Sequence, residues 1–180
     1  MILAFDTASE NTGIAARMSD GSVLPGATES EATLWWTSIN VHSPHIESRV
    51  GEIFVQARAL IAAWLLRAQA AELPMVLVLE QARRGRYQAV YAALRCAQAA
   101  LWCTAYEYDL PLRYVTPVQW RVAIGLAPKS TKAQACARIK LLNPELHDQL
   151  LTATEDEIDA VAIATAFSLG YSTTRKVRKV

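Results

Sequence analysis

Short runs of hydrophobic residues divide the chain into segments with the patterns of strands. Residues 1–6, MILAFD, form one such run and end in Asp6, and residues 75–80, MVLVLE, form another and end in Glu80. Continuous apolar runs of this length predict strands that are covered on both faces. Residues 12–18, TGIAARM, and 22–26, SVLPG, predict second and third strands joined by a turn at Asp20-Gly21, and LRYVT predicts a fifth.

Longer segments have the period of a helix. Apolar residues recur at helical spacing from 46 to 72, and shorter helices are expected at 117–125, 131–142 and 154–167. The alanine-rich segment 87–106 has almost no polar face. A helix that is apolar all round needs burial on both sides, so we expect it to pack against its own sheet and against a partner subunit.

Three antiparallel strands followed by alternating helices and strands predict an α/β fold, in which a mixed five-stranded sheet is flanked by helices. The length of 180 residues, with 52% hydrophobic residues, is typical of a single domain over 1–180. The chain opens without a basic leader, and its longest apolar stretch is too short to span a bilayer. Three cysteines form no CxxC motif, so we expect a cytoplasmic protein with no membrane contact.

The net charge of +1 hides a difference between the two halves of the chain. Residues 1–80 hold 4 basic and 9 acidic side chains, whereas residues 81–180 hold 14 and 8. The halves therefore carry −5 and +6, and the second half is a candidate surface for a polyanion. A basic tail occupies about 172–180.

The segment TEDEIDAVAIATAF, 154–167, sets four acids in front of a run of small apolar residues. Acids and a threonine at the start of a helix satisfy its free N–H groups and its dipole, which accounts for Glu155 and Glu157. Asp156 and Asp159 instead lie on the same stripe as Ile163, which should face the core. A buried carboxylate is costly unless it is paired, hydrogen-bonded or bound to a cation.

Parallel packing of the strands 1–6 and 75–80 would bring Asp6 and Glu80 together at their carboxyl ends, where open α/β sheets place their sites. The acids of the last helix could reach the same point. Carboxylates that converge in this way repel one another unless cations lie among them, and hard oxygen ligands suit Mg²⁺ or Mn²⁺. Such a cage suggests phosphoryl transfer with two metal ions.

Three segments in this order also resemble a known family: AFDTASENTGIA, VLEQARRG and DEIDAVAIA. They are similar to the signature segments of the RuvC-type Holliday junction resolvases, in the ribonuclease H-like superfamily. The resemblance implies a homodimeric crossover junction endodeoxyribonuclease that resolves four-way DNA junctions by paired nicks. It also implies two Mg²⁺ or Mn²⁺ ions in each active site, and catalytic metal ligands at Asp6, Glu80, Asp156 and Asp159. The loose match favours a phage-encoded or divergent member.

The family has a lysine before its penultimate helix, beside the scissile phosphate. In IGLAPKSTKAQACARI either Lys129 or Lys132 fits, and alignment of Lys-Ala-Gln-Ala with the helix start favours Lys132. The family's aromatic wedge after the Glu-Gln pair is missing, because Ala82 follows here. The expected DNA-binding residues are Arg83, Arg84, Arg86, Tyr87, Lys129 and Lys132.

Two other functions fit parts of the sequence. ILAFDTASENTGIA also resembles the opening of actin-like scaffold proteins of tRNA modification, which have no catalytic use for Glu80 or Asp159. A different ribonuclease H-like nuclease, acting on RNA–DNA hybrids, would share the metal cage.

Overall fold

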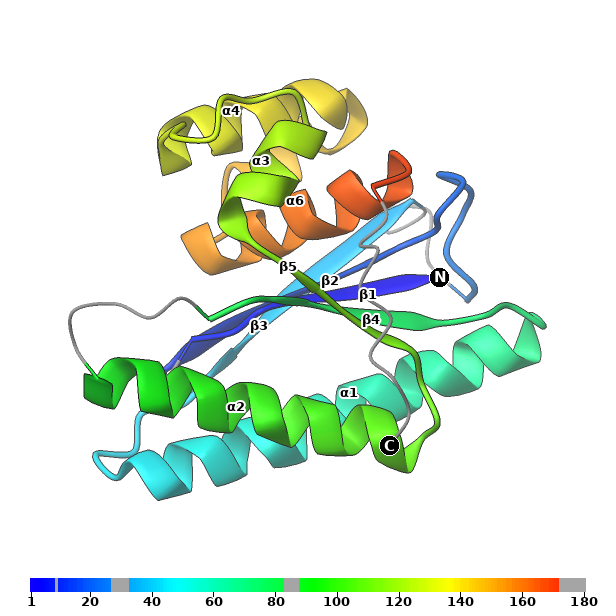
Figure 1. Ribbon diagram of the computed structural model, residues 1–180. Coiled ribbons are helices and arrows are strands. Elements are labelled where there is room, and N and C mark those ends of the chain that lie inside the picture. Colours follow the sequence, from blue (N-terminus) through cyan, green and yellow to red (C-terminus); the bar gives the residue numbers. More distant parts are fainter. Residues whose placement is uncertain (9, 27–32, 83–87, 172–180) are drawn as a thin grey trace.

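The computed structural model describes residues 1–8, 10–26, 33–82 and 88–171 (Figure 1). Five strands form one sheet in the order β3-β2-β1-β4-β5. Strand β2 pairs antiparallel with β1 and β3, whereas β4 pairs parallel with β1 and β5. This is the predicted mixed sheet. The strands are β1 (Ile2–Asp6), β2 (Asn11–Arg17), β3 (Leu34–Asn40), β4 (Val76–Glu80) and β5 (Leu112–Val115).

Helices cover both faces of the sheet. The two longest, α1 and α2, lie side by side on one face, and α3, α4 and α6 lie on the other (Figure 1). None of the helices in the described part of the chain is long and apolar enough to cross a membrane. The helices are α1 (Ile46–Ala70), α2 (Gln88–Glu107), α3 (Pro117–Ala123), α4 (Lys132–Leu142), η2 (Pro144–Leu146), α5 (His147–Leu150) and α6 (Glu155–Ser168).

The predicted third strand at 22–26 is wrong. The turn before it does form, because Asp20 accepts hydrogen bonds from both the amide and the hydroxyl of Ser22. Pro25 then lacks an N–H group for a sheet ladder. The third strand is β3, whose neighbouring Trp35 and Trp36 pack against opposite core layers, so its sequence shows no alternation of apolar and polar residues.

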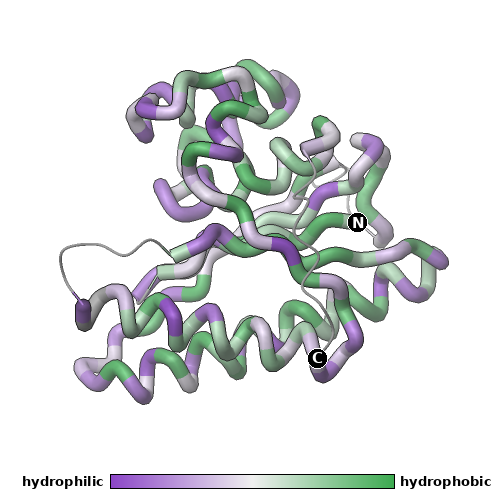
Figure 2. The backbone as a smooth tube through the Cα atoms, viewed as in Figure 1, coloured by the Kyte–Doolittle hydropathy of each residue, from purple (hydrophilic) through white to green (hydrophobic). Residues whose placement is uncertain are grey.

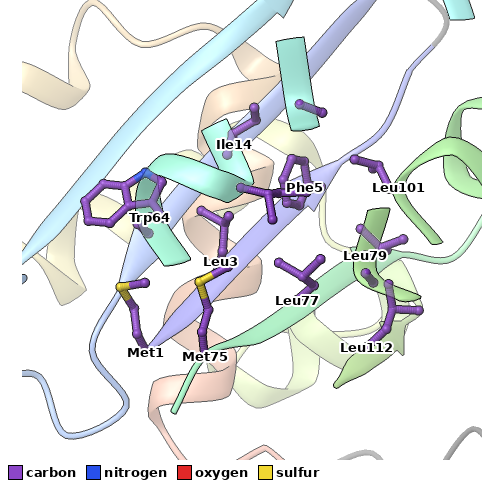
Figure 3. Packing of buried hydrophobic residues seen from close by; sticks show 14 of the residues in the cluster. Met1, Leu3, Phe5, Ile14, Trp64, Met75, Leu77, Leu79, Leu101 and Leu112 are labelled. Atoms are coloured by element: carbon purple, nitrogen blue, oxygen red, sulfur yellow. The ribbon is translucent and has the colours of Figure 1, made fainter. Parts of the chain in front are cut away.

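Each central strand divides its side chains between two core layers. On β1, Leu3 and Phe5 face the layer of α1 and α2 (Figure 3), whereas Ile2 and Ala4 face the layer of α6. Figure 2 shows β1 hydrophobic along most of its length, as a strand covered on both faces should be. Side chains alternate along a strand, so Asp6 lies on the face that α6 covers.

The three helices on that face begin in the same way. A threonine precedes each helix, and its hydroxyl accepts a hydrogen bond from the third helical residue, whose side chain bonds back to the threonine N–H. This capping box satisfies N–H groups that a helix start otherwise leaves open. The pairs are Thr116 with Gln119, Thr131 with Gln134, and Thr154 with Glu157.

Helix α6 is more deeply buried than one apolar stripe requires. Nine consecutive residues, 158–166, are buried, because the helix lies between the sheet and the helices α3 and α4. Small side chains make this possible, since five of the nine are alanine or threonine at positions 160, 162, 164, 165 and 166.

Gly13 of β2 permits the closest contact between α6 and the sheet. A Cβ atom at this position would lie 1.9 Å from the carbonyl oxygen of Asp156 and 2.3 Å from its carbonyl carbon. Both are backbone atoms and cannot rotate away. Any side chain at position 13 would therefore push the start of α6 off the sheet.

Substitution Gly13→Ala should destabilise the protein by about 1–3 kcal/mol or more, because backbone has to move to accept the methyl group. The free energy of unfolding, measured by urea denaturation, tests this.

Gly51→Ala provides the matched control. Gly51 lies in α1, and apart from the local backbone of its own helix no atom of the described residues lies within 4 Å of the point that a Cβ atom would occupy there. Alanine should therefore stabilise the helix by about 0.5–1 kcal/mol. Equal effects of the two substitutions would contradict the close contact.

Candidate active site

Two carboxylates lie next to each other at the carboxyl ends of the parallel strands. Phe5 of β1 pairs with Leu79 of β4, and the next residues are Asp6 and Glu80. Both continue the set of side chains that faces α6, because Ala4 and Val78, two residues earlier, pack in that layer. The sheet register thus brings together two acids that are 74 positions apart in the sequence.

The start of α6 brings the other two acids to the same edge. Gly13, which α6 contacts at Asp156, is the antiparallel partner of Asp6 in β2. Asp156 is half-buried in the first turn, and Asp159, one turn later, is 6% exposed. The prediction of an inward-facing acid is confirmed for Asp159, whereas Asp156 is only partly covered.

The pKa values of these acids are raised by burial and, chiefly at Asp6, by neighbouring carboxylates. Burial, together with repulsion by Glu80, Asp159 and Asp156, raises the pKa of Asp6 well above its ordinary value. Burial also raises the pKa of Asp159, although Lys132 and Arg121 oppose the shift. The pKa of Asp156 is raised by burial in the same way. Burial is thus the main cause at all three acids, and repulsion between acids adds most at Asp6.

Of the two candidate lysines, Lys132 is the one that the structure brings to this group. It is the first residue of α4, and its Nζ lies 3.1 Å from Glu155 Oε2 and 3.9 Å from Asp159 Oδ2. Burial lowers the pKa of Lys132, but the hydrogen bond to Glu155 and the nearby Asp159 raise it more, so its net pKa is raised. Lys129, the other candidate, lies exposed in the preceding loop.

Three site residues were not predicted from the sequence. Trp120 of α3 is fully buried, and its indole N–H donates a hydrogen bond of 2.7 Å to Glu80 Oε2. The guanidinium carbon of Arg121 lies 4.6 Å from the centre of the Trp120 ring. Gln98 of α2 is 1% exposed, and its amide donates to the carbonyl oxygen of Glu80 and to the Thr7 hydroxyl.

The sequence contained a signal for two of these residues. Gln98 is one of few polar residues in an otherwise apolar helix, and a buried amide needs partners. The Thr116-Pro117 cap starts a helix directly after β5, which places Trp120 near the carboxyl edge of the sheet. Neither pattern predicts that the hydrogen-bond partner is Glu80.

The other expected DNA-binding residues cannot be placed. Arg83, Arg84, Arg86 and Tyr87 lie outside the described residues, as does the basic tail 172–180.

The acids fit a hard divalent cation by charge and ligand type. Among the residues that the structure describes, no three His, Cys, Asp or Glu side chains are arranged to hold one ion. Mg²⁺ characteristically binds one or two carboxylates and completes its shell with water and substrate phosphates. Adjacent Asp6 and Glu80, with Asp159 near Asp6, meet that smaller requirement.

Solved structures share this arrangement of strands and helices. The structure of T. thermophilus RuvC in complex with a Holliday junction substrate superposes with a TM-score of 0.65 at 15% identity, over 93% of this chain and 92% of that one. The chain has the fold of RuvC. A second Thermus thermophilus RuvC structure gives a TM-score of 0.63 at 15% identity, over 93% of each chain.

The RuvC fold also occurs in the yeast mitochondrial Holliday junction resolvase Ydc2, with a TM-score of 0.58 at 12% identity, over 93% of this chain and 77% of that one. No family model and no curated protein sequence matches this chain. The likeness to RuvC is one of fold, and it agrees with the five-stranded sheet predicted from the sequence.

Neutralising Asp6 should stabilise the protein in the absence of metal. The pKa of Asp6 is higher in the folded chain than in the unfolded chain, where it is about 4. The free energy of unfolding therefore falls as the pH rises above about 4 and this carboxyl group ionises. With EDTA at pH 7, Asp6→Asn should therefore unfold at a temperature a few degrees above wild type, since about 1 kcal/mol corresponds to roughly 2–4 °C in a domain of this size. The difference should shrink as the pH falls toward 4.

Glu52→Gln serves as the control, because Glu52 is exposed on α1, which covers the opposite face of the sheet from α6. A lower melting temperature for Asp6→Asn than for this control would contradict repulsion at the site.

Proposed function

We propose that this protein is a metal-dependent endonuclease that resolves four-way DNA junctions as a homodimer, with one active site in each subunit. The observation that carries the proposal is the group of acids at the carboxyl edge of the sheet, on the fold of RuvC. RuvC has been solved with a Holliday junction substrate, which supports branched DNA as the substrate class. A scaffold protein would have no use for a costly group of acids, of which Asp159 is buried and the other three are partly buried.

The four acids would hold two Mg²⁺ or Mn²⁺ ions. Such ions, when bound, supply the charge that activates water and stabilises the leaving oxygen of a phosphodiester. Asp6 and Glu80 are held by the sheet, and Asp156 and Asp159 by the start of α6, so rigid elements orient all four. One of the acids would also orient the attacking water.

Lys132 would contact the scissile phosphate. Its side chain is half-exposed, and its ammonium group stays protonated because the neighbouring acids raise its pKa. It therefore offers a positive charge beside Asp159 to a substrate that approaches the acidic edge. Lys129 and the arginines 83, 84 and 86, with Tyr87, would bind the DNA backbone and bases.

Helix α2 would form the dimer contact. Trp102 is 44% exposed and Tyr106 is 80% exposed, and their rings stack with centroids 6.0 Å apart. The opposite side of the helix packs in the core layer with α1 through Ala97, Leu101 and Ala105, so the aromatic pair lies on the outer surface. Aromatic side chains are enriched among the residues that contribute most to protein interfaces.

Substitution Asp159→Asn should reduce cleavage of a strand-labelled four-way junction by about a hundredfold or more, because a charged ligand of the proposed ions is lost. Wild type should make paired nicks that require Mg²⁺ or Mn²⁺. Binding of the junction should be unchanged or tighter in the variant, because a negative charge near the phosphates is removed.

Asp148→Asn is the matched control, since Asp148 is exposed on α5 and should leave cleavage unchanged. Linear duplex and an RNA–DNA hybrid are tested beside the junction. Cleavage of the hybrid alone would identify the RNA–DNA hybrid, and not the junction, as the substrate. No cleavage of any substrate by folded wild type would favour the scaffold function.

Substitution Trp102→Glu should weaken the dimer by about tenfold or more, because it places a charge in an apolar contact. Sedimentation equilibrium gives the dissociation constant. Leu141→Glu is the control, because Leu141 is 73% exposed on α4, on the opposite layer. If the two variants have the dissociation constant of wild type, α2 is not the interface.

A further inference from the structure

Glu80 is held at two points by helices on opposite faces of the sheet. From α2, the Gln98 amide donates hydrogen bonds to the main-chain carbonyl of Glu80 and, at 3.2 Å, to Thr7 Oγ1. Thr7 follows Asp6 directly, so one buried amide ties together the ends of β1 and β4. The Gln98 side-chain oxygen accepts in turn from Arg95. The main chain that carries both acids is therefore fixed from the side of α2.

From α3, Trp120 fixes the carboxylate. The indole is fully buried, so its N–H needs an acceptor, and Glu80 Oε2 at 2.7 Å provides it. The indole ring packs in the core layer that includes Val115 and Ile124, and this packing restricts its movement. An ionised carboxylate has two oxygens with about four lone-pair sites, so accepting this hydrogen bond is compatible with binding a cation.

We propose that Trp120 is a positioning residue, which holds the Glu80 carboxylate in the orientation in which it binds a divalent cation. The proposal rests on the metal site of the proposed function. Groups that orient a metal ligand through a hydrogen bond usually contribute a factor of about 10–100 to metal affinity. The Trp120 indole meets this description, because its N–H bonds directly to a carboxylate oxygen of Glu80.

The choice of tryptophan supports this role over simple packing. Phenylalanine would fill most of the same space in an apolar layer without a polar group to satisfy. The guanidinium group of Arg121 also packs on the face of the Trp120 ring, and its positive charge lowers the pKa of Asp159. Helix α3 thus acts on two acids of the site, through one hydrogen bond and one charge.

Substitution Trp120→Phe should raise the Mn²⁺ concentration for half-saturation by about tenfold. Binding of Mn²⁺ to the protein without DNA is measured from the EPR signal of the free ion. Trp64→Phe is the matched control, because Trp64 is also a buried tryptophan but lies in the other core layer, and it should leave Mn²⁺ binding unchanged.

A double-mutant cycle separates positioning from packing. If Trp120 acts through the Glu80 carboxylate, Trp120→Phe should cause no further loss of Mn²⁺ binding in a Glu80→Ala background. An equal loss in both backgrounds, or Mn²⁺ binding by Trp120→Phe equal to that of wild type, would overturn the proposal. So would a wild-type protein that binds no Mn²⁺.

These outcomes are independent of the substrate. Mn²⁺ binding that depends on Trp120, in a protein that does not cut junctions, would overturn the proposed substrate and support the positioning role. Junction cleavage by the wild type, together with unchanged Mn²⁺ binding in Trp120→Phe, would support the proposed substrate and overturn the positioning role.

Discussion

The contact between Gly13 and the backbone of Asp156 is the constraint on which the arrangement of the site depends. Only a residue without a side chain lets α6 approach β2 so closely. Gly13 is also the sheet partner of Asp6, so the position that admits the helix is the position beside the first acid. The close packing at Gly13 thereby brings the acids at the start of α6 next to the acids at the ends of β1 and β4.

This arrangement concentrates negative charge at the cost of stability. Burial and mutual repulsion favour the protonated forms of these carboxyl groups, as the raised pKa values of Asp6, Asp156 and Asp159 indicate. Lys132 offsets part of the negative charge from the start of α4. Strain of this kind is typical of sites that bind cations or act on substrates, because selection for stability alone would remove it.

Helix α2 connects the two halves of the proposed function. Its inner face carries Gln98, which joins the ends of β1 and β4. Its outer face carries the exposed aromatic pair Trp102 and Tyr106. A partner subunit bound to that pair would therefore rest on the same helix that holds the main chain of the acids, and the geometry of a dimer and the geometry of its sites would be set by one rigid element.

Local pattern was sufficient to predict the sheet class, most of the helices and the inward-facing Asp159 of α6, because these depend on periodicity and on the high cost of a buried charge. The place of β3 at 34–40, the approach of Lys132 to Asp159 and the bond from Trp120 to Glu80 depended instead on how the elements pack. Trp120 and Glu80 are 40 positions apart. No local pattern records such a pair, since it exists only when the sheet register and the packing of α3 place the two side chains within hydrogen-bond distance.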